Sequence, residues 1–248
     1  MKRLILLTND DGIDAPGLAD LFWATQGVGR RFVVAPAVNQ SAASHSFSLR
    51  KPIRVERRKS NWYAVYGTPT DCVLISHHGI FRRKIDIVVS GINDSPNMGD
   101  DVLYSGTVAA AIEAALLGMP AVAISYLKVG ENRHLVRSFL NKILPLLLKG
   151  LLPRKCILNV NIPAGEVKGV KVTRLGKRIY QDMAIKGRLP DGKICYTIDG
   201  EMGFAPTRGS DFEAVYNGYI SVTPLHLDMT HHFEVQRLER AFKRLGLS

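Results

Sequence analysis

Asp10 and Asp11 are the residues whose types and position point most directly to chemistry. They follow the apolar run Leu4–Leu7 almost at once, and Gly12 comes directly after them. Neighbouring side chains on a regular strand point to opposite faces, but a turn permitted by Gly12 allows both carboxylates to reach one ion. Two adjacent carboxylates repel each other unless a cation neutralises them. Because Asp-Asp-Gly is also typical of a solvated turn, the metal hypothesis depends on the neighbouring loops.

Further polar loops follow other apolar runs and supply the same kind of ligand atom. Asn39-Gln40-Ser41 follows one run, Ser90-Gly91-Ile92-Asn93 ends another, and Asn97 to Asp101 comes shortly afterwards. These loops offer carboxylate, hydroxyl and amide oxygens without Cys or His. An all-oxygen set suits a hard cation such as Mg²⁺, Mn²⁺ or Ca²⁺ rather than zinc.

Ser105-Gly106-Thr107 opens an alanine-rich segment that ends at Gly118, with Pro120 beyond it. Alone, this opening is typical of an ordinary helix N-cap. The alternative is that the exposed N–H groups, the two hydroxyls and the positive helix end bind a phosphate. A cation at Asp10 and Asp11 beside an anion here would make a site for a phosphate ester.

The elements that must position these loops alternate along the first two thirds of the chain. Apolar runs predict buried strands, and periods of three to four residues predict helices. The predicted strands are Leu4–Leu7, Phe32–Ala35, Ile85–Ser90, Ala121–Ser125 and Ile157–Asn161; the predicted helices are Pro16 to Thr25, Pro69 to Ile80, Ser105–Gly118 and Leu135–Leu148, in which Pro145 is expected to end or kink the helix. This alternation predicts an α/β fold with a mostly parallel, doubly wound sheet, whose ligands bind outside the carboxyl ends of the strands.

After about Lys168 the pattern changes to strand-like stretches. These are Val170–Arg174, Gly187–Ile198 with a turn at Leu189–Lys193, and Tyr219–Thr223. They predict an antiparallel arm, and Phe233–Leu245 predicts a charged amphipathic helix. We expect one domain over residues 1–248, with a core to about 168, a β-rich arm over about 169–218 and a C-terminal segment over 219–248.

Composition excludes several classes of protein. The chain has 248 residues, 46% of them hydrophobic, which argues against disorder. Its three cysteines have no metal-binding or disulfide spacing and fit a reducing cytoplasm. No apolar run approaches the length of a membrane span, and the N-terminus turns polar too early for a signal peptide.

The net charge of +11 suggests nucleic-acid binding as a hypothesis, but the placement of the charge along the chain argues against it. Lys51–Lys59 carries a net +4 and Glu166–Lys193 a net +5, together +9 of the +11, whereas Thr8–Asp20 and Asn93–Glu113 each hold four acids and no Lys or Arg. No alternation of aromatic and basic residues marks a stacking platform. We therefore expect no stable nucleic-acid partner.

The histidines contribute less to the predicted site. His45 follows the Ser41 loop and could reach the site as an acid or base. His77-His78 and His231-His232 are expected to be structural or exposed, with a cap before the last helix as one role.

Six segments together make the sequence resemble the SurE (stationary-phase survival protein) family of metal-dependent nucleotide phosphatases. The resemblance extends from residue 4 to about residue 230. The segments that carry it are Leu7 to Gly12, Ala35-Pro36 with Asn39-Gln40-Ser41, Gly67-Thr68-Pro69 with Asp71-Cys72-Val73, Val89 to Asn93 with Pro96 to Gly99, Tyr104 to Ala111, and Val222 to Leu225.

The resemblance implies a Rossmann-like three-layer core, with a projecting β-hairpin arm and a C-terminal helix exchanged between the subunits of a homodimer or homotetramer. It also implies hydrolysis of nucleoside 5′- and often 3′-monophosphates, with short polyphosphate as a further substrate. The metal would be Mg²⁺ or Mn²⁺ first, with Co²⁺ and Ca²⁺ as alternatives. By resemblance, the metal ligands are Asp10, Asp11, Ser41 and Asn93, the phosphate pocket contains Asn9, Asn97, Ser105, Gly106 and Thr107, and Asp10 and Asp11 are catalytic.

The sequence departs from the family pattern at two places and leaves three alternatives open. Ala37 stands where the family commonly has Asp, and Asp94-Ser95 replaces a small Ala-Gly-like pair. The nucleophile is expected to be a metal-bound water, with direct attack by Asp10 as the alternative. A non-catalytic nucleotide- or phosphate-binding regulator, and an RNA-binding protein, are the rival functions.

Overall fold

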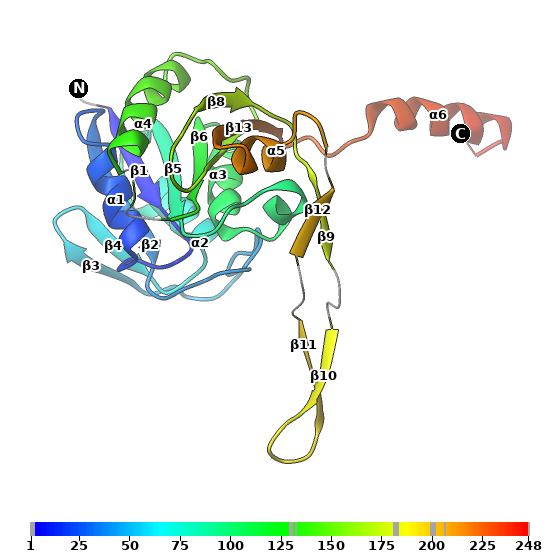
Figure 1. Ribbon diagram of the computed structural model, residues 1–248, viewed down its shortest axis with the longest axis horizontal. Helices are drawn as coiled ribbons and strands as arrows, with labels where there is room; N and C mark the ends of the chain where they lie inside the picture. Colours follow the sequence, from blue (N-terminus) through cyan, green and yellow to red (C-terminus); the bar gives the residue numbers. More distant parts are fainter. Residues whose placement is uncertain are drawn as a thin grey trace.

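A nine-stranded sheet forms the centre of the molecule (Figure 1). The computed structural model describes residues 3–128, 131, 133–180, 184–198, 202–205 and 207–247. The strand order is β3-β4-β2-β1-β5-β6-β7-β13-β8. The strands are β1 (Leu4–Thr8), β2 (Arg30–Pro36), β3 (Val55–Lys59), β4 (Trp62–Val65), β5 (Ile87–Asn93), β6 (Ala121–Tyr126), β7 (Cys156–Ile162), β8 (Gly169–Val172) and β13 (Tyr219–His226).

Most neighbouring strands of this sheet run parallel. The continuous series β4-β2-β1-β5-β6-β7 is parallel, whereas β3 is antiparallel to β4 and β13 is antiparallel to β7. Parallel neighbours need crossover connections, which a helix supplies between β1 and β2, between β5 and β6 and between β6 and β7. The α/β class with a mostly parallel sheet is therefore confirmed.

Helices cover both faces of the sheet, and β1 shows why its sequence is apolar throughout. Ile5 and Leu7 pack into the same cluster as residues of α1 (Pro16–Ala24) and α4 (Arg133–Leu147). Leu4 and Leu6 pack into the opposite cluster with residues of α2 (Pro69–Ile75) and α3 (Gly106–Leu116). Since successive side chains of a strand alternate between faces, a strand covered on both sides needs apolar residues at every position.

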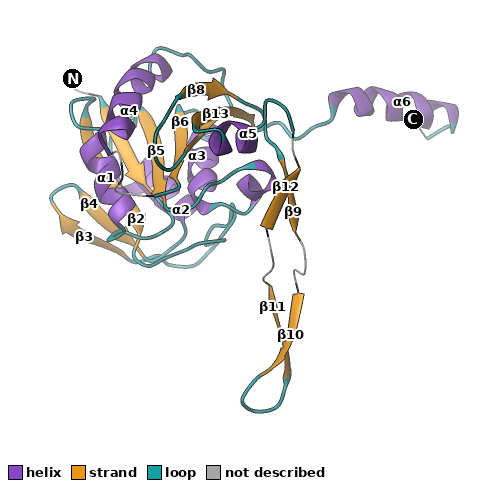
Figure 2. Ribbon diagram, viewed as in Figure 1, coloured by secondary structure: helices purple, strands orange, loops and turns teal. Residues whose placement is uncertain are grey.

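A narrow two-stranded arm projects from this body (Figure 2). Its base pairs β9 (Lys177–Tyr180) with β12 (Met202–Ala205), and its outer part pairs β10 (Ala184–Arg188) with β11 (Ile194–Ile198). The predicted turn at Leu189–Lys193 connects β10 to β11. Two elements within 169–218 belong to the body instead: β8 pairs with β13, and α5 (Asp211–Tyr216) packs against β13.

The last helix, α6 (His232–Arg244), lies away from the body and has no buried residue in the described chain (Figure 1). Its predicted span was Phe233–Leu245, and His231 forms the predicted cap by accepting from the Glu234 N–H. Among the described residues, no helix has the length and apolar character needed to cross a membrane.

Several elements differ from the sequence predictions in extent. The predicted helix Pro69 to Ile80 consists of α2 followed by a π-helical turn, η1 (Ser76–Ile80). Pro145 lies within the last turn of α4, which continues to Leu147. The pattern did not predict β3, β4, β9, β12, α5 or the 3₁₀ segment η2 (Gly99–Leu103).

Candidate active site

A cavity of about 720 Å³ lies beside the carboxyl ends of β1 and β5, at the edge where the sequence placed the polar loops. The loops after β1, β2 and β5 meet there with the start of α3 and with the arm. The residues that line the cavity are Asp10, Asp11, Ser41, Ala42, Asn93, Asp94, Ser95, Pro96, Asn97, Asp101, Tyr104, Ser105, Arg178 and Ile198. Six of the nine predicted site residues are thus brought to one cavity.

The three others lie behind Asp10 rather than in the lining. Asn9 is fully buried and its side-chain nitrogen donates to the Gly12 carbonyl at 2.9 Å. Thr107 is also fully buried, and its hydroxyl donates to Asp10 Oδ1. Gly106 is the first residue of α3, and a Cβ there would lie 2.8 Å from Asp10 Cβ. These three residues contact or support the acidic pair.

The turn that carries the two carboxylates is fixed by backbone contacts. Gly12 has a φ of +109°, a conformation that side-chain-bearing residues rarely adopt. The Gln40 N–H donates to the Asp10 carbonyl at 2.7 Å, which ties the loop after β2 to the turn after β1. Ser41, the next residue, is exposed in the cavity wall, and its N–H donates to Asn39 Oδ1 at 2.7 Å.

Both carboxylates have raised pKa values. Burial is the main cause for Asp10, which is 4% exposed, and hydrogen bonds from Thr107 and Gly106 oppose it. The pKa of Asp11 is raised to about 6, first by burial, then by the negative charges of Asp10 and Asp94. A bound cation would lower both pKa values because it stabilises the ionised carboxylates.

Asn93 is the last residue of β5, and Asn97 lies in the loop that follows. Side chains of β6 and β7 hold this loop. Asn93 Nδ2 donates to the Ser95 carbonyl at 2.7 Å, which makes its side-chain oxygen the atom available to a cation. Asn97 is nearly buried: its N–H donates to Asn161 Oδ1 and its Nδ2 to Ser125 Oγ, both at 2.8 Å. Asn159 and Asn161 also donate to the Asn97 carbonyl, at 2.7 and 2.9 Å.

The start of α3 closes the cavity beside Asp10. Ser105 caps the helix by accepting from the Val108 N–H at 3.1 Å. The first turn carries the positive end of the helix and lies against a carboxylate, which is the favourable arrangement for a negative charge. The predicted cap is therefore present, and its hydroxyl lies in the lining.

His45 lies outside this lining. Its Nε2 lies 2.9 Å from Glu113 Oε2 on α3, so it links the Ser41 loop to that helix. His77 and His78 lie on η1 with their rings in edge-on contact. The histidines thus have structural contacts in the described chain.

Sequence reasoning missed three groups that belong to this region. Arg178, from the base of the arm, forms an ion pair with Asp101 of η2. Ile198, the last residue of β11, also lines the cavity. Asp211 is fully buried and accepts from the Gly99 and Gly176 N–H groups, each at 2.8 Å. The sequence signal for Asp211 was its position after Ser210, a typical start of a helix; no spacing pattern connects the other two to Asp10.

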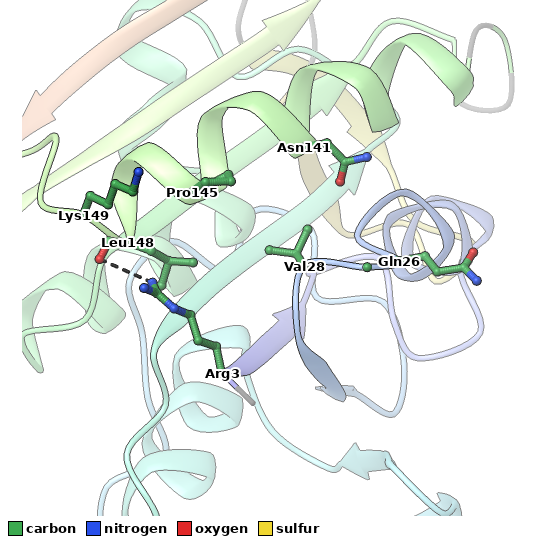
Figure 3. A pocket seen from close by; sticks show the side chains of 8 residues that line it. Arg3, Gln26, Val28, Asn141, Pro145, Leu148 and Lys149 are labelled. Carbon is green, nitrogen blue, oxygen red and sulfur yellow. Dashed lines mark hydrogen bonds between the residues drawn. The ribbon is translucent and has the colours of Figure 1, made fainter. Parts of the chain in front are cut away.

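A second hollow of about 450 Å³ lies near the amino ends of β1 and β2, beside α4 (Figure 3). It is lined by Arg3, Gln26, Gly27, Val28, Asn141, Pro145, Leu148 and Lys149. Arg3 Nη1 donates to the Leu148 carbonyl at 3.4 Å. Its described lining contains no carboxylate, so it lacks the chemistry of the predicted site.

The donor atoms of the first cavity fit a divalent cation of the hard type. Carboxylate, hydroxyl and amide oxygens meet there, and Asn9 Oδ1 is buried beside them without a hydrogen-bond partner in the described chain. Within the described ranges, no group of three or more His, Cys, Asp and Glu side chains is suited to a metal. A metal site in this cavity therefore requires the oxygens of Ser41 and Asn93 in addition to the two carboxylates. The fold and this cavity define an α/β protein with an oxygen-rich site at the carboxyl edge of its sheet.

Comparison with known proteins identifies the family. The family model described as "Survival protein SurE" matches residues 5–182, and the chain belongs to the SurE family. The chain is 44% identical over 242 residues to the 5′-nucleotidase SurE of Geotalea uraniireducens (strain Rf4), covering 95% of this chain and 98% of that protein. It is 46% identical over 236 residues to the 5′-nucleotidase SurE of Gemmatimonas aurantiaca, covering 92% and 94%.

A solved structure shows the same fold. The crystal structure of the SurE protein from Aquifex aeolicus superposes with a TM-score of 0.83 at 39% identity. The match covers 98% of this chain and 99% of that chain. The family predicted from the six sequence segments is therefore confirmed.

Proposed function

We propose that the chain is a divalent-metal-dependent 5′-nucleotidase that hydrolyses nucleoside 5′-monophosphates to nucleoside and phosphate. Nucleoside 3′-monophosphates and short polyphosphate are further proposed substrates. The observation that carries the proposal is the acidic pair Asp10 and Asp11, which shares one cavity with Ser41 and Asn93. The names of the relatives, 5′-nucleotidase SurE, support the same activity.

Asp10, Asp11, Ser41 and Asn93 are proposed to hold the cation. Their oxygens suit Mg²⁺ or Mn²⁺, with Co²⁺ and Ca²⁺ as alternatives. When bound, such an ion polarises a phosphoryl oxygen and lowers the pKa of a water molecule. The adjacent carboxylates would bring the negative charge that attracts the ion, although burial raises the pKa of each.

The phosphate is proposed to lie between this pair and the start of α3. Ser105 and Asn97 supply polar groups from the cavity wall, while Gly106, Thr107 and Asn9 hold the backbone and the Asp10 carboxylate in place. The positive end of α3 favours the phosphate charge.

A water molecule is the proposed nucleophile. Its oxygen forms the new bond to phosphorus, the bond from phosphorus to the nucleoside oxygen breaks, and a proton passes to that leaving oxygen. Direct attack by Asp10 is the alternative, but the burial of Asp10 and its hydrogen bond from Thr107 favour a holding role.

We also propose that the chain acts as a homodimer or homotetramer in the cytoplasm, exchanging its arm and C-terminal helix between subunits. Exposed apolar residues on α6 support this assembly, among them Phe233 at 67% and Phe242 at 46% exposed. The chain is proposed to form one domain: a core to about residue 168, the region of about 169–218, in which the arm lies between β8 and α5 of the body, and the C-terminal segment 219–248.

Release of phosphate from AMP tests the proposed function. The assay supplies Mg²⁺, Mn²⁺ or Co²⁺ in separate reactions and is repeated with excess EDTA. We expect activity that EDTA abolishes and added metal restores. Nucleotide binding without phosphate release under any of these metals would favour the non-catalytic regulator. RNA affinity that falls steeply with salt, together with no phosphatase activity, would favour the RNA-binding protein.

A further inference from the structure

The lining of the cavity also contains two large residues with apolar surface. Tyr104, the residue that follows η2, is 59% exposed, and Ile198, the last residue of β11, is 70% exposed. Both line the same cavity as Asp10, although 94 positions separate them in the chain. Large apolar groups exposed beside a polar site are typical of places where the apolar part of a ligand binds.

We propose that Tyr104 and Ile198 form the subsite for the nucleobase, with Ile198 contributed by the arm. The inference rests on the proposed function, since it assumes that the ligand is a nucleotide. A cavity of about 720 Å³ has room for more than a phosphate group. The ring of Tyr104 offers a face for stacking, and Ile198 covers the other side of the base.

Two contacts fasten the base of the arm to the segment that carries Tyr104. The Arg178 guanidinium, on β9, pairs with Asp101 of η2, and the Arg178 side chain is only 9% exposed. That guanidinium also lies 5.7 Å from the centre of the Phe212 ring. The carboxylate of Asp211 accepts from Gly99 of η2 and from Gly176, just before β9.

These contacts define the kind of recognition. Because η2 and the base of the arm are held together, Tyr104 is positioned against the arm before a ligand binds, which reduces the ordering cost of binding. A tyrosine face and an aliphatic side chain contact the faces of a base and do not read its edges. The subsite therefore distinguishes nucleotides from simple sugar phosphates, with weak discrimination among bases.

The test compares two phosphate esters in the metal-loaded enzyme. The measured quantity is the ratio of kcat/KM for AMP to kcat/KM for ribose 5-phosphate, which lacks the base. We expect Tyr104→Ala and Ile198→Ala each to lower this ratio about tenfold, mainly through KM for AMP, as expected for a lost stacking contact. Tyr104→Phe keeps the ring and is expected to retain the ratio within about twofold.

Matched controls exist on the same elements. Leu103→Ala changes a residue that is 61% exposed beside Tyr104, and Ile194→Ala changes one that is 54% exposed on the strand of Ile198; neither lines the cavity. Both are expected to leave the ratio unchanged. Equal wild-type kcat/KM for the two esters, or an unchanged ratio in Tyr104→Ala and Ile198→Ala, would overturn the inference while leaving the proposed function intact. Absence of hydrolysis of both esters by the wild type would overturn both.

Discussion

Replacing Gly106 by alanine provides a sharp steric test of the position of Asp10. The new Cβ would lie 2.8 Å from Asp10 Cβ, 3.0 Å from Asp10 Oδ2 and 3.2 Å from Pro69 Cγ. Carbon atoms in ordinary contact lie about 3.5–4.0 Å apart. The carboxylate or the start of α3 must therefore move by roughly 0.7 Å.

A shift of this size matters more to the site than to the fold. Mg²⁺ accepts oxygen ligands only within a narrow distance range, and a misplacement of about 1 Å costs roughly 100-fold in rate. We expect kcat/KM for AMP to fall about 100-fold in Gly106→Ala. The clash costs about 1–3 kcal/mol, and the better helix propensity of alanine offsets up to about 1 kcal/mol, so the protein should remain folded.

The assay is phosphate release from AMP under saturating Mg²⁺ or Mn²⁺, beside thermal unfolding of the same samples. Gly79→Ala is the matched control, because a Cβ there lies 3.9 Å from its nearest neighbour, Ile75 Cγ2, in ordinary contact. A folded Gly106→Ala protein with kcat/KM within threefold of the wild type would refute the assigned role of Asp10.

Two further predictions concern protonation and buried hydrogen bonds. In the metal-free protein the pKa of Asp11 is about 6, so the carboxyl is largely protonated at pH 5 and a cation must displace its proton. Calorimetry should give a Kd for Mn²⁺ about tenfold higher at pH 5 than at pH 7, and equal values would contradict this. Asp211→Ala leaves the Gly99, Gly176 and Phe212 N–H groups without their acceptor. Urea unfolding should therefore show a free energy of unfolding that is lower by about 3 kcal/mol. The control Asp100→Ala, at an exposed position, should lower it by less than about 0.5 kcal/mol. A decrease of less than about 1 kcal/mol in the free energy of unfolding of Asp211→Ala would be inconsistent with this role of the Asp211 hydrogen bonds.

The sequence was most informative where local pattern and burial agree. The run Leu4–Leu7 is apolar at every position because both faces of β1 are covered, and the polar turn that follows must lie at the sheet edge. The segment from Ser105 forms the predicted helix because its cap and its alanines are local signals. Such features need no knowledge of distant residues.

Contacts between distant segments were beyond the reach of sequence patterns. The sequence did not predict β3 because Val55–Lys59 is mostly charged and is exposed at the edge of the sheet. Asn159 and Asn161 lie within the buried strand β7, where only the position of Asn97 explains them. Arg178 and Ile198 reach the cavity through the path of the arm, which no spacing in the sequence specifies.

The acidic pair after β1 is proposed to carry metal-dependent phosphate-ester hydrolysis. Its most direct test is kcat/KM for AMP in Asp10→Asn, measured with saturating Mn²⁺ beside the wild type. Asp14→Asn is the control, since Asp14 is exposed nearby and does not line the cavity. We expect a loss of more than about 100-fold in Asp10→Asn and wild-type activity in Asp14→Asn. A folded Asp10→Asn protein that retains wild-type, metal-dependent activity would contradict it.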